Sequence, residues 1–298
     1  MTTFLTLLFA GLALGGIYAL VAIGFTVIYR SSRVINFAQG EMLALGALIT
    51  SSLISTYGLT FFAAFLVGVT ATAIAGFLFQ VLVLRFAVGK PEFTIVMLTL
   101  GLAAILNAVL DSSYGAIPRP NGDPWGASVV KIGSVSVEWV QVWTVITALL
   151  LLVLFWLFNQ RTKWGIAIRS AATDPEAAAA VGIPLRRVYA TSWVLAGVVA
   201  CVGGVFLGGY PNSVSPSISD AALLAFPAII LGGLESTTGA VIGGFIIGVV
   251  QELTQGYQPT YVAWLGSEFY TIAPYVLMII VLLVRPQGLF GERSAERL

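Results

Sequence analysis

The sequence of 298 residues has no histidine and a single cysteine, Cys201. One cysteine excludes an intramolecular disulfide and a cysteine cage for zinc, and the lack of histidine excludes a Ser/His/Asp triad and a histidine-ligated metal. A phosphate-binding loop of the type G-x-x-x-x-G-K-[ST] is also missing, since Gly89-Lys90 is followed by Pro91. We therefore expect a chain without enzymatic activity, metal site, resident cofactor or nucleotide hydrolysis of its own.

Charge is scarce as well: 9% of the residues are charged, against about 25% in soluble domains. Apolar residues make up 58% of the chain, more than a globular core of this length can bury. The solvent of most of the chain is therefore expected to be a lipid bilayer. The net charge of +1 gives no reason to expect nucleic acid as a partner.

Nine apolar stretches contain a single charged residue, Glu41. They span residues 4–29, 41–57, 59–84, 93–110, 139–158, 188–210, 221–234, 236–251 and 269–284. Continuously apolar runs satisfy their backbone in lipid as helices, so we predict an all-α polytopic membrane protein with about 8–10 transmembrane helices. The stretches 221–234 and 236–251 are short and separated only by Glu235, which predicts a tight turn, half-helices or a re-entrant pair.

Lysine and arginine gather in four places, and cytoplasmic loops carry an excess of these residues. The clusters are Arg30 and Arg33; Arg85 and Lys90; Arg161, Lys163, Arg169, Arg186 and Arg187; and Arg285, Arg293 and Arg297. All four are cytoplasmic if the chain crosses nine times, with its N-terminus outside and its C-terminus in the cytoplasm. The loop 111–138 is then external.

Residues 1–298 are expected to form one transmembrane domain. Four apolar stretches precede the linking helix 139–158 and four follow the cytoplasmic loop 159–187, so the halves 1–110 and 188–285 have opposite orientations. Inverted repeats of this kind are common in transporters.

A polar hexamer that ends in an acid opens a helix in each half: Asn36 to Glu41 and Ser215 to Asp220. One interpretation is a pair of ordinary helix starts, with Glu41 and Asp220 as helix caps. The other is non-helical backbone that lines a path at membrane depth, which is tolerated where it faces protein or water. Pairs of glycines four residues apart predict close helix packing: Gly11 and Gly15, Gly204 and Gly208, Gly239 and Gly243, and Gly244 and Gly248.

The segment 171–184 predicts a short helix of about two turns in the cytoplasmic loop. Thr173 and Glu176 have the spacing of a capping box, and four alanines propagate the helix. Gly182 is suited to a left-handed C-cap. Such a small-surfaced helix either docks into a groove of another protein or rests on the membrane surface.

Glu176-Ala177-Ala178-x-x-x-Gly182 resembles the EAA loop of bacterial ABC importer permeases. Ile35-Asn36-Phe37-Ala38-Gln39-Gly40-Glu41 resembles the N-F-A-[HQ]-G-E signature of the branched-chain amino acid permease family. Further similarity is found in Gly15-x-x-Tyr18-Ala19-Leu20, in Leu231 to Leu234 followed by Gly239 to Gly244, and in Pro286 to Gly291. The similarity is collinear over nearly the whole chain, which is much more specific than the EAA pattern alone.

The resemblance implies a permease subunit in a bacterial plasma membrane, importing branched-chain or similar amino acids. Its expected partners are a homologous second permease, two cytoplasmic ATPases that use ATP, and an extracytoplasmic substrate-binding protein. By carry-over, the ATPase-coupling residues are Thr173, Asp174, Glu176, Ala177, Ala178 and Gly182. The substrate-path candidates are Asn36, Gln39, Glu41, Ser217, Ser219 and Asp220. The alternatives are a secondary transporter or channel, which needs an ion site or filter, and a membrane-embedded enzyme, which needs a catalytic cluster.

Overall fold

The computed structural model describes residues 2–87, 90–126, 128–132, 135–209 and 213–291. Its long helices are α1 (Thr2–Ser32), α2 (Gln39–Tyr57), α3 (Phe61–Leu82), α4 (Glu92–Tyr114), α5 (Trp139–Arg161), α8 (Leu185–Gly208), α11 (Thr237–Tyr261) and α12 (Phe269–Val284). The shorter helices are α6 (Lys163–Thr173), α7 (Pro175–Ala180), α9 (Ala221–Leu224) and α10 (Phe226–Gly232). Short 3₁₀ turns cover Leu84–Phe86, Pro216–Asp220 and Ala263–Leu265.

Six helices among the described residues are long and apolar enough to cross a membrane: α1, α3 with its following turn, α4, α5, α8 and α11. The other three predicted stretches correspond to α2 with 19 residues, the segment Pro216–Gly232 and α12 with 16 residues. The all-α polytopic fold is therefore confirmed. The predicted break at Glu235 is also present, because α10 ends at Gly232 and α11 begins at Thr237. The stretch 221–234 is itself divided into α9 and α10.

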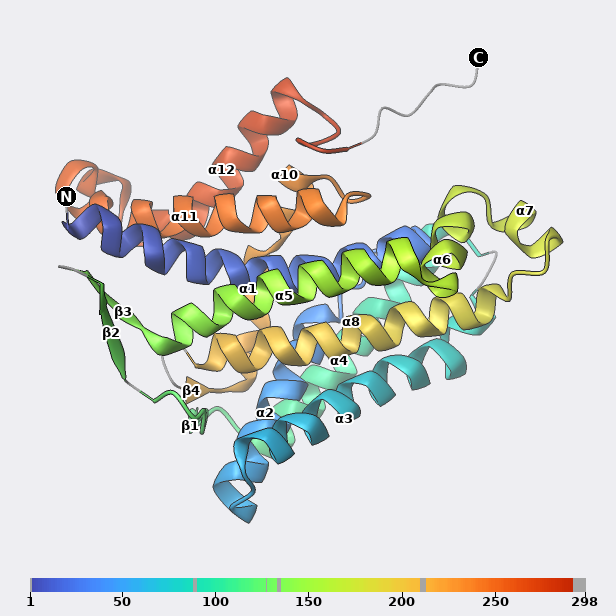
Figure 1. Cartoon of the computed structure of the whole chain (residues 1–298), viewed down its shortest axis with the longest axis horizontal. Helices are drawn as coiled ribbons and strands as arrows, with labels where there is room; N and C mark the ends of the chain where they lie inside the picture. Colours follow the sequence, from blue (N-terminus) through green and yellow to red (C-terminus); the bar gives the residue numbers. More distant parts are fainter. Residues whose placement is uncertain (1, 88–89, 127, 133–134, 210–212, 292–298) are drawn as a thin grey trace.

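Helices α1, α8 and α11 form the inside of the molecule, and most of the α8 side chains are buried. Helix α1 packs against α11, α8 and α5, while α8 also packs against α2 and α3. Figure 1 shows α1, α5, α8 and α11 running roughly along the long axis of the molecule. Helices α3, α4 and α5 present most of their apolar side chains outward, as expected of surfaces that face lipid or another subunit.

Glycines allow the inner helices to approach closely. A Cβ atom on Gly248 of α11 would meet the backbone of Gly15 on α1, and one on Gly15 would meet the backbone of Phe245. The prediction that the glycine pairs serve packing is confirmed for Gly11, Gly15, Gly244 and Gly248 between α1 and α11. Because lipid tails are as apolar as side chains, this backbone proximity is a main source of helix association in a membrane.

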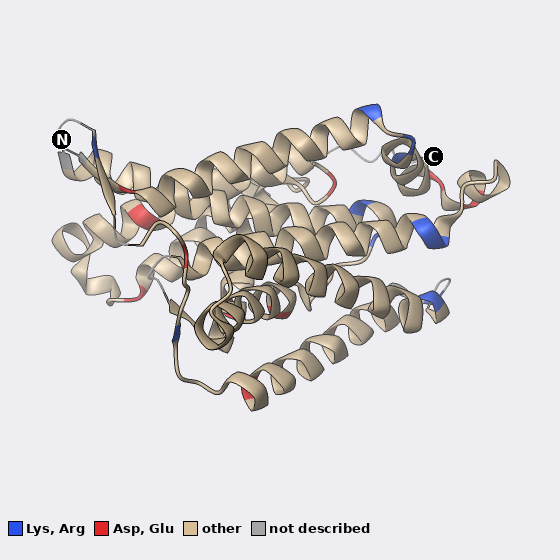
Figure 2. Cartoon of the chain, turned by 60° about the horizontal axis from the view of Figure 1, so that its bottom comes forward, with Lys and Arg blue, Asp and Glu red and all other residues tan. Residues whose placement is uncertain are grey.

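The two ends of the bundle differ. The antiparallel hairpin of β2 (Val129–Ile132) and β3 (Val135–Glu138) and the pair of β1 (Arg119–Pro120) with β4 (Ser213–Val214) lie at one end. Helices α6 and α7 lie at the other (Figure 1). Most of the basic residues are gathered at the α6–α7 end (Figure 2). Arg293 and Arg297, used in the orientation argument, lie outside the described residues.

Candidate substrate path and coupling surface

The connection between α1 and α2 turns back into the protein. Residues 34–36 have no regular secondary structure and follow Arg33, whose φ of 56° is the one positive value among the described non-glycine residues. Gln39 then lies against Gly24, where a Cβ atom would meet its side chain. Gly24 precedes the end of α1 by eight residues, or about 12 Å of helix. Helix α2 therefore starts inside the bundle, well below the end of α1.

Asn36 and Gln39 are fully buried and bonded within the chain. The Asn36 amide donates to Oε1 of Gln39 (3.1 Å), and its Oδ1 accepts from the backbone of Ala38 (3.0 Å). The Gln39 amide donates to the carbonyl of Ala196 on α8 (3.3 Å). In this conformation these two candidates fix the start of α2 against α8.

The second hexamer forms a 3₁₀ turn, Pro216–Asp220, and the first is helical from Gln39 onward. The first hexamer is therefore non-helical only before Gln39, and most of the second is a 3₁₀ turn. The two hexamers nevertheless meet: a Cβ atom on Gly40 would contact the carbonyl of Ser219 and the side chain of Ala222. Two helix starts that are about 180 residues apart in sequence are thus packed against each other inside the bundle.

Glu41, the last residue of the first hexamer, lies in the first turn of α2. It is half-buried beside the second hexamer and α4. Its carboxyl group is beside Ser219, and its Oε1 accepts from the Asn107 amide on α4 at 3.5 Å. Its Oε2 is buried and has no hydrogen-bond partner among the described residues. Asp220 is exposed nearby. Asp220 is the N-cap residue of α9 and Glu41 lies in the first turn of α2, but neither carboxylate forms a side-chain cap hydrogen bond among the described residues.

The structure thus divides five of the six path candidates into two groups. Asn36 and Gln39 are internal, whereas Glu41, Ser219 and Asp220 lie together around the contact of the hexamers. Ser217 is exposed, and its hydroxyl is 2.8 Å from that of Ser215. Asn107 joins the second group and was not predicted; the signal was an amide in an otherwise apolar stretch.

Helix α7 and the residues on either side of it contain the six predicted coupling residues. Asp174 is its N-cap, and Oδ1 of Asp174 accepts from the backbone N–H groups of Glu176 (3.0 Å) and Ala177 (2.9 Å). The predicted capping box of Thr173 and Glu176 is therefore wrong: Thr173 ends α6 and its hydroxyl donates to the carbonyl of Arg169. Gly182 has a φ of 88°, and the N–H of Ile183 bonds to the carbonyl of Ala178. The left-handed exit at Gly182 is confirmed.

One face of α7 is open and the other is anchored. Ala178 is buried, while Glu176 and Ala177 are exposed and Val181, just past the helix, is 78% exposed. A hollow of about 450 Å³ lies between α6 and α7, lined by Arg169, Ser170, Thr173, Asp174, Ala177, Ala178 and Val181. A well-capped knob with an apolar tip beside an open hollow is a surface suited to another protein.

Helix α6, which precedes this knob, was not predicted. Its N-cap Thr162 accepts from the N–H of Gly165 (2.9 Å), and Ile168 and Ala171 are buried against α8. Arg33 joins it to the rest of the bundle: the guanidinium donates to the carbonyl of Ala172 (3.4 Å) and forms an ion pair with Glu235. Partial burial lowers the pKa of Arg33, but the hydrogen bond and charge of Glu235 outweigh it and leave the pKa above its ordinary value.

A polytopic helical bundle with interrupted helices that meet inside it, and a short capped helix at one end, defines a membrane protein of the transporter class. The family model described as "Branched-chain amino acid transport system / permease component" matches residues 7–282. The chain belongs to this family, and the resemblance drawn from the sequence motifs is confirmed. It is a multi-pass membrane permease component.

Curated relatives are similar over almost the full length. The high-affinity branched-chain amino acid transport system permease protein LivH of Salmonella typhimurium is 30% identical, over 99% of this chain and 97% of that one. LivH of Escherichia coli (strain K12) has the same identity and coverage, and BraD of Pseudomonas aeruginosa is 30% identical over 96% and 95%. A solved structure, PsaBC from Streptococcus pneumoniae in complex with Fab, aligns with a TM-score of 0.49 and 15% identity over 95% of this chain and 92% of that chain.

Proposed function

We propose that this chain is the permease subunit of an ABC importer and forms part of the path for branched-chain or similar amino acids. The observation that carries the proposal is the contact between the two helix starts at Gly40 and Ser219. Interrupted helices in corresponding positions of two halves mark the substrate route in many transporters. The names of the full-length relatives support the substrate class.

Glu41, Ser217, Ser219 and Asp220, with Asn107, are the groups we assign to the path, and Asn36 and Gln39 hold its wall in place. A zwitterionic amino acid needs hydrogen bonds for both of its ends, but weak ones, because release must follow entry. The half-buried carboxylate of Glu41, with one oxygen unpaired among the described residues, is suited to the ammonium end.

The expected assembly contains a homologous second permease, two cytoplasmic ATPases that use ATP, and a binding protein that delivers substrate from outside. Outward apolar surfaces of α3 and α4 support a membrane-embedded partner. The basic residues at the α6–α7 end support a cytoplasmic location for that end, hence a C-terminus in the cytoplasm and, with nine crossings, an N-terminus outside.

The path assignment is tested by uptake of radiolabelled leucine in vesicles that contain the complete transporter. Glu41→Gln keeps the side-chain size and removes the charge, so uptake should fall about tenfold, the factor expected for one charge-assisted hydrogen bond. Glu252→Gln, a matched change at a half-buried carboxylate on α11, should leave uptake near wild type. Equal effects of the two variants would exclude Glu41 from the path.

Coupling is tested separately at α7. Val181→Asp places a charge on the exposed apolar tip, and Gly182→Trp puts a bulky side chain at a φ of 88°, where only glycine is unstrained. Both should release the ATPase subunits on purification or abolish substrate-stimulated ATP hydrolysis, while the permease stays in the membrane. Lys90→Asp, in an exposed loop outside α7, is the control. Normal uptake by both α7 variants would remove the docking assignment.

A further inference from the structure

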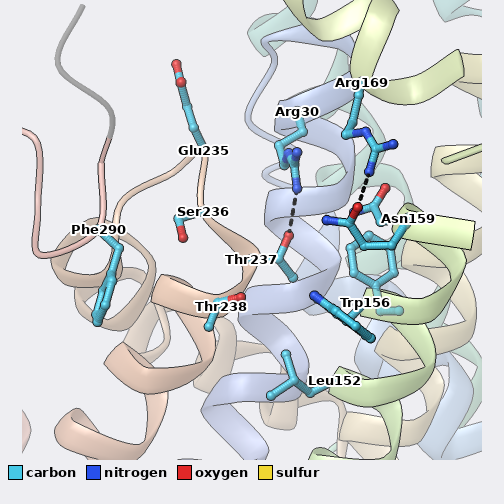
Figure 3. Close-up of a pocket in the computed structure, with 12 residues that line it drawn as sticks. Arg30, Leu152, Trp156, Asn159, Arg169, Glu235, Ser236, Thr237, Thr238 and Phe290 are labelled. Atoms are coloured by element: carbon cyan, nitrogen blue, oxygen red, sulfur yellow. Dashed lines mark hydrogen bonds between the residues drawn. The ribbon is translucent and has the colours of Figure 1, made fainter. Parts of the chain in front are cut away.

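A basic cavity lies between α1, α5, α6 and the start of α11, away from the contact of the hexamers. Its volume is about 240 Å³, far more than the ~30 Å³ of one water molecule. Arg30 of α1 and Arg169 of α6 lie at its upper rim (Figure 3). A second cavity of about 220 Å³ shares Arg30, Arg169 and Glu235 with it and adds Arg33.

The walls of the two cavities carry three arginines and one glutamate, and that glutamate is already paired with Arg33. Hydrogen bonds hold the other two guanidinium groups in place: Arg30 donates to the hydroxyl of Thr237 (3.4 Å) and Arg169 to the amide of Gln160 (3.1 Å). Guanidinium groups fixed in this way are suited to phosphate oxygens, which they bind through two donors at once.

The N-terminus of α11 adds a second source of positive potential. This helix has 25 residues, and its N-cap Ser236 accepts from the N–H of Gly239. Thr237 and Thr238, whose N–H groups precede the first intrahelical hydrogen bond, line the cavity together with Ser236. Helix N-termini with free N–H groups are established positions for phosphate.

Asn159 is the buried polar residue of the cavity wall. Its side chain lines the cavity, is only 6% exposed, and its Oδ1 is buried without a hydrogen-bond partner among the described residues. That oxygen is covered by protein atoms, so a ligand in the cavity does not reach it in this conformation. The ligand is therefore defined by an anionic group for the arginines.

The lower wall of the cavity is apolar. Leu152 and Trp156 of α5 lie below the arginines (Figure 3), and Trp156 is 51% exposed on the outer face of the bundle. A polar, basic end above an apolar wall that opens to the outer surface matches the polarity of a phospholipid at the edge of the bilayer.

We propose that this cavity binds a phosphate group, presented by the headgroup of an anionic phospholipid such as phosphatidylglycerol. Arg30, Arg169 and the N-terminus of α11 bind the phosphodiester. The acyl chains lie along Leu152 and Trp156. The bound lipid then ties α6, the helix before the coupling knob, to the start of α11.

The test uses the full-length protein in neutral detergent. Native mass spectrometry measures the retention of dioleoylphosphatidylglycerol and of dioleoylphosphatidylcholine, which has the same acyl chains but no net charge and no hydroxyls. Thermal melting with inorganic phosphate measures binding of the free anion. Arg169→Gln and Thr238→Asp should each weaken binding about tenfold, since one removes a charge-assisted contact and the other adds a repelling charge.

Weaker binding by Thr238→Asp cannot be attributed to misfolding, because a carboxylate in the first turn stabilises the helix while it repels an anionic ligand. Arg187→Gln, outside the cavity on α8, and Thr238→Ser are the matched controls and should bind like wild type. Stabilisation by inorganic phosphate that both variants abolish would support the site with a soluble phosphate as its source. Equal retention of the two lipids by all variants, with no phosphate-dependent stabilisation, would overturn the proposal.

Discussion

The hydroxyl of Tyr18 on α1 donates a buried hydrogen bond of 2.8 Å to the Gln251 side chain on α11, 233 residues later in the chain. It lies in the same interface as the glycine contacts between these two helices. Because both side chains are buried, the bond fixes which residues of α1 and α11 face each other, whereas apolar contacts alone would allow the helices to slide.

The first prediction concerns this bond. Tyr18→Phe leaves the Gln251 amide buried without its donor, so the free energy of unfolding should fall by about 1–3 kcal/mol. The measurement is thermal or denaturant unfolding of the purified protein in detergent. Tyr261→Phe, at a tyrosine that is 74% exposed, should change nothing. Adding Gln251→Leu to Tyr18→Phe should recover part of the loss; no recovery would mean that the hydroxyl acts in another way.

The second prediction concerns the closest helix approach. Gly248→Ala forces α11 away from the backbone of Gly15 and should cost about 1–3 kcal/mol, the usual range for overpacking. Gly101→Ala on α4 is the matched control, because a Cβ atom there meets nothing within 4 Å. The control should be neutral or slightly stabilising. Melting temperatures of the two variants, measured side by side, distinguish packing from a general intolerance of alanine.

The third prediction concerns the cap of α7. Asp174→Ala removes the acceptor for two backbone N–H groups and should destabilise the helix by about 0.5–2 kcal/mol. Thr173→Ala should have little effect, since that side chain bonds to the carbonyl of Arg169 on α6. Hydrogen exchange of the Glu176 and Ala177 amides reports the difference directly. Faster exchange in the Thr173 variant than in the Asp174 variant would restore the capping box expected from the sequence.

The fourth prediction concerns the ion pair of Arg33 and Glu235, whose side chains are 44% and 40% exposed. Exposed pairs contribute little, so a double-mutant cycle with Arg33→Gln and Glu235→Gln should give a coupling energy below about 1 kcal/mol. The coupling should decrease as salt is added. A larger, salt-independent value would show that the pair is shielded from solvent by another part of the assembly.

Much of the fold was predictable from composition, because a bilayer imposes long apolar helices and sends charge to the loops. The break at Glu235 was predictable because a charged residue interrupts an apolar run there. The left-handed exit at Gly182 was predictable because glycine adopts a positive φ without strain. The inward return of residues 34–38 was not predictable from the local sequence. It depends on the carbonyl of Ala196 on α8, far away in the sequence, and on the space that Gly24 leaves on α1.

The cap of α7 shows how a local signal was misread. Thr173 and Glu176 have the capping-box spacing, but Pro175 lies at the first helical position, which makes the residue before it the N-cap. The pairing of β1 with β4 had no local signal, since it joins two-residue strands almost 100 residues apart. Glu41 was singled out by its charge, but its neighbour Asn107 is brought to it by the packing of α4 against α2.

The packing of α1 on α11 and of α3 on α8 has a consequence for synthesis. Helix α1 leaves the ribosome more than 200 residues before α11, so its glycine-lined face has no protein partner while the central helices are inserted. Lipid, or a factor of the insertion machinery, must cover that face in the meantime. A chain that stops before α11 therefore keeps the glycine-lined face of α1 without its protein partner. We expect quality-control proteases to degrade such a truncated chain.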